Sequence, residues 1–165
     1  MNDNILYFDI ESSDLPIHTA RIITISFIYN GEEKTLYINP GVPIKKEASF
    51  VNGIYDKDVK DWKPFSYYAP QIIKLLKKCE AYAGYNCRKF DIPLLSIELL
   101  RCGYEMPNKP IFDIYEMVQG LFKSLKLKDI YTVLTGEIFN AHKSSEDIRA
   151  TQKLYYYLRT NFYER

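Results

Sequence analysis

The sequence of 165 residues predicts an α/β fold class, with a mixed five-stranded sheet flanked by helices. Three strand-like segments come first and are spaced to form an antiparallel meander. Strand-like and helix-like segments then alternate, which adds parallel strands and places helices on the faces of the sheet. The length suffices for one domain with a sizeable core, so we expect residues 1–165 to form a single domain.

The first three strands are predicted from apolar, β-prone runs and one turn signal. Residues 4–11 and 21–29 are rich in Ile, Tyr and Phe. Asn30-Gly31 follows the second run and is a strong hairpin signal. Residues 34–39 then return as the third strand of the meander.

Residues 40–67 are punctuated by proline and glycine and are predicted to be irregular, with short helices possible near 47–50 and 56–60. The apolar residues of 69–79 recur at helical spacing. Residues 81–86 are predicted as the fourth strand.

The C-terminal half is predicted to alternate between helix and strand. Its expected elements are a helix over 90–103 that ends at Gly103, a strand or strand-to-helix transition over 110–117, a short helix over 127–135 and a long final helix over 145–162.

Composition restricts the classes of function. The net charge is +1, so any binding of nucleic acid would depend on local basic groups. No apolar run reaches the roughly 20 residues that a membrane span needs, and we expect no membrane partner. The N-terminus lacks the features of a signal peptide, and Cys79, Cys87 and Cys102 form no CxxC pair. We therefore expect reduced thiols, no zinc signature and a cytoplasmic location.

Two acids interrupt the first predicted strand. Asp9 and Glu11 lie on one face of it, about 7 Å apart along the chain, because side chains alternate. Buried carboxylates are costly and repel each other, and a divalent cation offsets both effects because it takes oxygen ligands. The alternative is that both acids lie on a solvent-exposed face.

Two further segments carry candidate site residues. Asp91 lies at the start of a predicted helix, where an acid can simply stabilise the helix dipole. His142 precedes the last helix and Asp147 lies in its first turns, where Ser144 and Asp147 could form a capping box without any chemistry.

Taken in order, these residues resemble a known family. The patterns D-x-E (Asp9, Glu11), N-x-x-x-F-D (ending at Asp91) and H-x-x-x-x-D (His142, Asp147) resemble the DEDDh 3′→5′ exonucleases. These form a DnaQ-like, ribonuclease H-like group that includes the proofreading exonuclease subunit of bacterial DNA polymerase III. The resemblance implies a ribonuclease H-like sheet.

The resemblance extends over about residues 5–158. The segment RIITISF resembles the second strand of the family. Residues 38–65 resemble the family segment in which the patterns N-P, V-H-G-I and P-F follow one another. Asp113 lies where the family commonly has an acid between its second and third motifs.

The family's activity is then the expected function. The resemblance implies a metal-dependent 3′→5′ exonuclease that acts on single-stranded DNA or frayed duplex ends and releases nucleoside 5′-monophosphates. Two divalent cations, Mg²⁺ or Mn²⁺, would lie about 3.5–4 Å apart. The expected ligands are Asp9, Glu11, Asp91 and Asp147, all counted as catalytic, and His142 is the expected general base.

Substrate contacts are expected from residues near these motifs. The candidates are Ser12, Ser13, Asn52, Asn86 and Phe90. The chain departs from the family at several of these positions, since Ser12-Ser13-Asp14 replaces Thr-Thr-Gly and Asn52 replaces a histidine. We interpret these departures as changes in contacts to the terminal nucleotide.

Two alternatives stay open. The chain could act on RNA or oligoribonucleotides, since the sequence does not show which residue would sense a 2′-hydroxyl. It could instead be a non-catalytic module that binds nucleic acid or a polymerase. The expected partners are 3′ ends of single-stranded nucleic acid, with DNA favoured over RNA, and a polymerase or repair protein is a further candidate partner.

Overall fold

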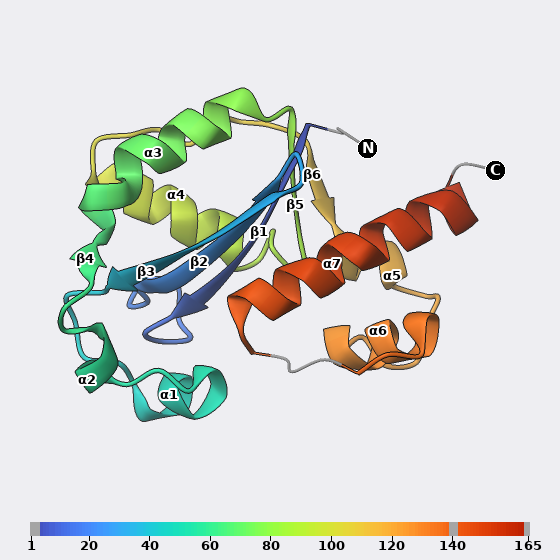
Figure 1. The fold of residues 1–165 in the computed structure, drawn as a ribbon, viewed down its shortest axis with the longest axis horizontal. Helices are drawn as coiled ribbons and strands as arrows, with labels where there is room; N and C mark the ends of the chain where they lie inside the picture. The colour runs from blue at the N-terminus through green and yellow to red at the C-terminus, as the bar shows by residue number, and fades with distance from the viewer. Residues whose placement is uncertain (1–3, 139–141, 164–165) are drawn as a thin grey trace.

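A six-stranded sheet forms the centre of the molecule in the computed structural model, which describes residues 4–138 and 142–163 (Figure 1). The strands are β1 (Ile5–Ser12), β2 (Ile22–Tyr29), β3 (Glu32–Asn39), β4 (Lys63–Pro64), β5 (Ala81–Gly84) and β6 (Ile111–Asp113). Their order across the sheet is β4-β3-β2-β1-β5-β6.

The pairing confirms a mixed sheet built on a meander. β1, β2 and β3 pair antiparallel, and β5 and β6 add on parallel to β1. The predicted number of five strands is wrong, because β4 pairs with β3 at the edge. β4 spans only Lys63–Pro64, too short to show any alternation, and its proline suits an edge position.

Helices cover both faces of the sheet. They are α1 (Lys46–Asn52), α2 (Asp56–Val59), α3 (Phe65–Lys78), α4 (Asp91–Arg101), α5 (Ile114–Val118), α6 (Leu127–Thr135) and α7 (Ser144–Leu158), and a π-helical stretch (Arg159–Tyr163) follows α7. Within the described ranges, none of these helices has the length and apolar character required to cross a bilayer.

Two predicted helix boundaries are wrong. α3 begins at Phe65 rather than at residue 69, so Pro70 lies inside the helix and not in its first turn. The long final helix predicted over 145–162 ends as an α-helix at Leu158 and continues as the π-helical stretch. Phe65 and Tyr67–Tyr68 have weak helix propensity, and packing of Phe65 in the core overrides it.

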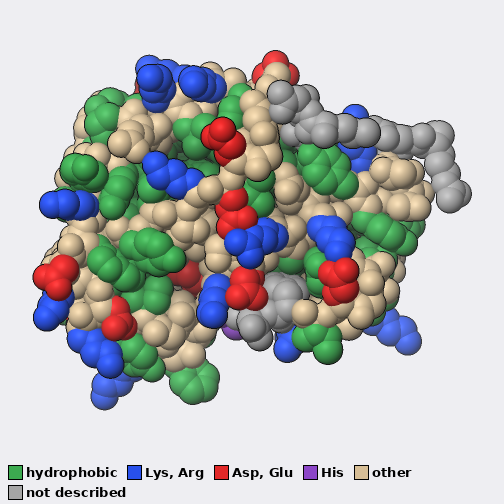
Figure 2. Space-filling model, viewed as in Figure 1, with side chains coloured by type: hydrophobic (Ala, Val, Ile, Leu, Met, Phe, Trp, Pro, Cys, Tyr) green, Lys and Arg blue, Asp and Glu red, His purple; other side chains and the backbone are tan. Residues whose placement is uncertain are grey.

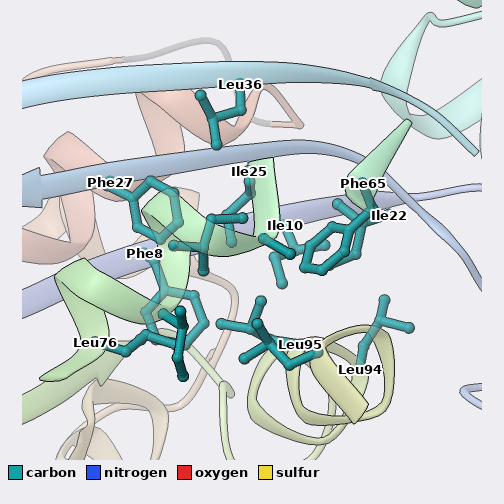
Figure 3. Close-up of a cluster of buried hydrophobic side chains, with 14 of the residues drawn as sticks. Phe8, Ile10, Ile22, Ile25, Phe27, Leu36, Phe65, Leu76, Leu94 and Leu95 are labelled. Atoms are coloured by element: carbon teal, nitrogen blue, oxygen red, sulfur yellow. The ribbon is translucent and has the colours of Figure 1, made fainter. Parts of the chain in front are cut away.

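Alternation along β1 divides the core between the two faces. Leu6 and Phe8 point toward α3 and α4, where Phe8 lies among buried side chains that include Leu76 and Leu95 (Figure 3). Ile5 and Tyr7 point to the other face, which α5, α6 and α7 cover. Asp9 and Glu11 continue this second face toward the end of β1.

Gly84 allows the chain after β5 to approach β1 closely. A Cβ at this position would lie 2.6 Å from Cys87 Cβ and 3.1 Å from the carbonyl oxygen of Phe8. Only glycine avoids both contacts. The loop that leads into α4 is thereby held against the strand that carries Asp9.

Candidate metal centre

The strand β1, which carries Asp9 and Glu11, lies beside α7 (Figure 1). The side chain of Asp147, in the first turn of α7, lies near both acids. In the β1–β2 pairing, Asp9 is opposite Ser26 and Glu11 is opposite Thr24, and the register shifts between Glu11 and Ser12. Both acids are partly buried. The alternative that they lie on a solvent-exposed face of the sheet is wrong, because α7 packs on that face of β1 and β2.

Asp91 is the first residue of α4 and points into the sheet. Its Oδ1 accepts a hydrogen bond of 2.9 Å from the backbone N–H of Ile10, which lies between the two acids of β1. The Asp91 side chain is only 6% exposed. The carboxylate therefore ties the start of α4 to β1 as well as contributing negative charge to the site.

Asp147 and His142 enter from the segment that begins α7. Asp147 is 8% exposed, and its Oδ2 accepts a hydrogen bond of 2.8 Å from the backbone N–H of His142. His142 itself is exposed and has a φ of 71°, a left-handed conformation that is uncommon for histidine. This hydrogen bond fixes the path of the chain around the histidine.

The predicted ligands from distant parts of the chain converge. Asp9, Glu11 and Asp147 each present an oxygen atom, and these oxygens all lie within 4.8 Å of one another. Asp91 lies close enough to raise the pKa of Asp9. Among the described residues, no lysine or arginine forms an ion pair with any of the four carboxylates. An oxygen-only donor set of this charge fits Mg²⁺ or Mn²⁺.

The four carboxylates all have raised pKa values. Burial raises the pKa of Asp9 well above its usual range, and the charges of Asp91, Glu11 and Asp147 add to the effect. Burial raises the pKa of Glu11 to about 8, with Asp147 and Asp91 contributing. For Asp91 and Asp147, burial again dominates and raises the pKa to about 7 and to about 6. In their ionised form, these acids thus carry a cost of burial and of mutual repulsion that a cation would relieve.

The raised pKa values of these four acids predict an unusual pH dependence of stability for the metal-free protein. In the unfolded chain these acids release their protons near pH 4, whereas the folded chain retains them up to about pH 6–8. Folding therefore takes up protons, so the contribution of these acids to stability is fully present below about pH 4 and is lost as pH rises toward 8.

The expected loss is more than about 1 kcal/mol between pH 5 and pH 8, or at least about 2–4 °C in Tm. Thermal denaturation in EDTA across this range measures it, and repeating the series with Mn²⁺ should flatten the curve. A metal-free Tm that rises steadily from pH 5 to pH 8 would contradict the arrangement of charges.

The serines after Glu11 form a tight turn. The Ser12 hydroxyl donates to the carbonyl of Asp14, and the carboxylate of Asp14 accepts from Leu15 N–H and Thr19 Oγ1, so Asp14 is a turn residue. Ser13 is buried, and its hydroxyl accepts from Arg21 N–H. Both serines are near the site, and Ser13 supports the turn through this bond.

Asn52 connects α1 to the same turn. Its Nδ2 donates to the carbonyl of Ser12 at 3.3 Å, and its Oδ1 accepts from Ile54 N–H at 2.9 Å. The backbone N–H of Lys45 also donates to the carbonyl of Ser13 at 2.9 Å. The segment that contains Asn52 is therefore fixed beside the end of β1.

Asn86 and Phe90 lie in the loop between β5 and α4. Asn86 adopts a φ of 56°, and its backbone N–H donates to Asp113 Oδ1 at 2.8 Å. Phe90 precedes Asp91 and packs against the core beneath α3 and α4. Its role as a substrate contact stays a prediction, and the geometry shows a packing role for its ring.

Asp113 has a structural role that the sequence did not reveal. It is 3% exposed, and its carboxylate accepts hydrogen bonds from three backbone N–H groups, those of Asn86, Arg88 and Tyr115. It therefore caps α5 and also holds the loop before Asp91. Only its position at a predicted strand-to-helix transition could have indicated this role.

Asp113→Ala is expected to destabilise the fold by about 3 kcal/mol, because it leaves these buried backbone donors without acceptors. Asp113→Asn retains an oxygen that can serve Asn86 and Tyr115 and should cost about 1 kcal/mol. Urea denaturation in EDTA checks both values. Equal stability of the alanine variant and the wild type would show that the carboxylate does not hold the loop.

The comparisons with known proteins agree with this geometry. Residues 7–155 match the family model RNase_T, described as Exonuclease. The chain therefore belongs to this exonuclease family, and the expected DnaQ-like family membership is confirmed.

Individual relatives are more distant. The chain is 24% identical over 156 residues to DNA polymerase III PolC-type from Caldanaerobacter subterraneus subsp. tengcongensis, covering 90% of this chain and 11% of that protein. It is 26% identical over 152 residues to 3′-5′ exonuclease DinG from Bacillus subtilis, covering 87% of this chain and 16% of that protein. It thus spans less than a fifth of either relative.

Solved structures confirm the fold. A zinc-bound E. coli exonuclease I in complex with single-stranded DNA superposes with a TM-score of 0.85 at 17% identity, covering 97% of this chain and 41% of that one. Exonuclease I from Methylocaldum szegediense superposes with a TM-score of 0.82 at 22% identity, covering 97% of this chain and 41% of that one.

Proposed function

We propose that the chain is a DEDDh-type 3′→5′ exonuclease domain that hydrolyses phosphodiester bonds of single-stranded DNA or frayed duplex ends and releases nucleoside 5′-monophosphates. One observation carries this proposal: carboxylates from β1, α4 and α7 converge without a cationic side chain among the described residues to neutralise them. Purely structural acids would be paired or exposed, because unpaired buried charge is destabilising.

The four carboxylates would hold two divalent cations. Asp9, Glu11 and Asp147 already present oxygens to a common point, and Asp91 lies next to Asp9. When bound, two Mg²⁺ or Mn²⁺ ions would stabilise the charge on the attacking and leaving oxygens during hydrolysis of the phosphodiester. The chain's own residues would keep these ligands in place, and no described lysine or arginine pairs with their carboxylates.

His142 would act as general base and take the proton of the attacking water. Imidazole is the side chain that most often serves as a general base in proteins. Its exposure leaves the ring free to reach a substrate, and the hydrogen bond from its backbone to Asp147 places it next to the acids. The base and a metal ligand are therefore positioned by the same short segment.

The terminal nucleotide would lie over the turn after β1. Ser12 and Asn52 border this turn, and Asn86 leads into the loop before Asp91. The lysines and arginines on the face shown in Figure 2 are dispersed among acidic and hydrophobic side chains, so this face offers no continuous basic path for a long strand.

DNA is favoured over RNA as the substrate because the relatives include a DNA polymerase and an exonuclease I bound to single-stranded DNA. A polymerase or repair partner belongs to the same proposal, on the basis of the PolC-type relatives. The three free cysteines agree with a cytoplasmic location. RNA or oligoribonucleotides are the second candidate class of substrate.

A digestion assay tests the proposal. Matched DNA and RNA oligonucleotides labelled at the 5′ end are incubated with the protein in Mn²⁺, in Mg²⁺ or in EDTA. We expect ladders that shorten from the 3′ end, faster on DNA, with none in EDTA. Release of the 5′ label as a mononucleotide with no ladder of shortened strands would contradict the polarity, and undiminished cleavage in EDTA would contradict the metal dependence.

A further inference from the structure

A row of buried hydroxyl groups lies beside the acids of β1. Ser26 and Thr24 on β2 are the residues opposite Asp9 and Glu11, and paired residues of neighbouring strands project to the same face. Thr35 on β3 extends the row, because it is paired with Ser26 and their hydroxyls are 2.7 Å apart. The face of the sheet below the start of α7 is therefore polar although it is buried.

Ser144 joins this row from α7. Its hydroxyl lies 3.0 Å from Thr24 Oγ1 and 2.8 Å from Ser26 Oγ, and the residue is 4% exposed. The capping box predicted for Ser144 and Asp147 is wrong, because Lys143 is the N-cap residue and has no capping hydrogen bond from its side chain. The Ser144 side chain instead attaches the helix to β2.

The network fixes where α7 begins. Ser144 is the first residue of the helix, Asp147 follows in the same turn, and His142 comes just before it. A shift or rotation of this turn would remove the Ser144 hydroxyl from the buried hydroxyl of Thr24 and would break one of the two hydroxyl contacts of Ser26, which is costly. The hydrogen bonds therefore favour one position of α7, in which the Asp147 oxygen faces those of Asp9 and Glu11.

We propose that Ser144 is a positioning residue, and that its hydroxyl, held by Thr24 and Ser26, keeps Asp147 and the His142 segment in register with the acids of β1. This inference rests on the proposed function. Ser144 itself does not touch the cation or the substrate. Outer-shell partners of metal ligands typically change metal affinity or activity by about 10–100-fold when they are removed.

α7 itself offers a matched control. Thr151 lies two turns further along α7 and is 1% exposed, and its hydroxyl has no hydrogen-bond partner among the residues that the structure describes. Ser144→Ala and Thr151→Val each remove one buried hydroxyl from the same helix, but only the first breaks the network. A difference between the two variants therefore reports the network and not a general weakening of the helix.

Calorimetric titration of the folded protein with Mn²⁺ tests the inference. Ser144→Ala should weaken Mn²⁺ binding by about 10-fold or more, whereas Thr151→Val should stay within about 2-fold of the wild type. Ser144→Thr, which keeps a hydroxyl, should recover most of the affinity. On single-stranded DNA, Ser144→Ala should lower kcat at saturating Mn²⁺ by more than it raises KM.

The outcomes separate this inference from the proposed function. Mn²⁺ affinity of Ser144→Ala within about 2-fold of the wild type would overturn the positioning role and leave the exonuclease proposal intact. A wild type that binds no Mn²⁺ would overturn both. If Ser144→Ala does not fold, Ser26→Ala takes its place, because it removes a partner of Ser144 from β2. Affinity equal to that of Thr151→Val would then reject the inference.

Discussion

Asp9→Asn is expected to lower the rate of DNA hydrolysis by about 10³-fold or more and to raise the Tm of the metal-free protein. The first effect follows because Asp9 lies within the acid cluster, and losing several kcal/mol of charge stabilisation by the bound cations costs at least this factor. The second follows because the variant removes one of several buried carboxylates that repel one another.

The increase in Tm should be about 2–4 °C, which corresponds to about 1 kcal/mol in a chain of this size. Thermal denaturation in EDTA and single-turnover digestion measure the two effects on the same preparation. Asp61→Asn is the matched control, because it neutralises an exposed acid outside the cluster. Activity of Asp9→Asn above about a tenth of the wild type would mean that this carboxylate is not a ligand.

His142→Asn is expected to lower kcat by about 10²–10⁴-fold while Mn²⁺ affinity changes little. The imidazole would be lost as a base, but the hydrogen bond to Asp147 comes from the backbone N–H of residue 142 and would survive. Asparagine also tolerates the φ of 71° better than alanine does. The comparison of His142→Asn with His142→Ala therefore separates loss of the base from backbone strain.

His18 provides the control, because it is the other histidine in the sequence. Its side chain is exposed, and it lies outside the H-x-x-x-x-D motif that contains His142. His18→Ala should retain the rate of the wild type. Pre-steady-state digestion with saturating Mn²⁺ measures the chemical step. A rate for His142→Asn within about 3-fold of the wild type would assign proton transfer to another group.

Much of the fold could be predicted from the sequence because its signals are local. The Asn30-Gly31 turn joins β2 to β3, and the short helix predicted over 127–135 matches α6. β4 could not be predicted, because an edge strand of two residues acquires its conformation from pairing with β3. The start of α3 was missed for a similar reason, since burial of Phe65 outweighs its helix propensity.

The candidate site could be predicted only in part. The spacing of D-x-E places Asp9 and Glu11 on one face of a strand, and the three motifs together indicated that Asp147 would join them. The sequence could not show that Asp113 accepts three backbone hydrogen bonds or that Ser144 bonds to β2. These contacts depend on strand register and helix placement, which no short-range pattern encodes.

The central claim is that the acids of β1, α4 and α7 bind a pair of divalent cations. Anomalous diffraction from crystals grown with Mn²⁺ and a nucleoside 5′-monophosphate tests it most directly. We predict two manganese peaks about 3.5–4 Å apart, in contact with oxygens of Asp9, Glu11, Asp91 and Asp147. Well-ordered crystals with Mn²⁺ bound elsewhere, and none between these carboxylates, would contradict the account.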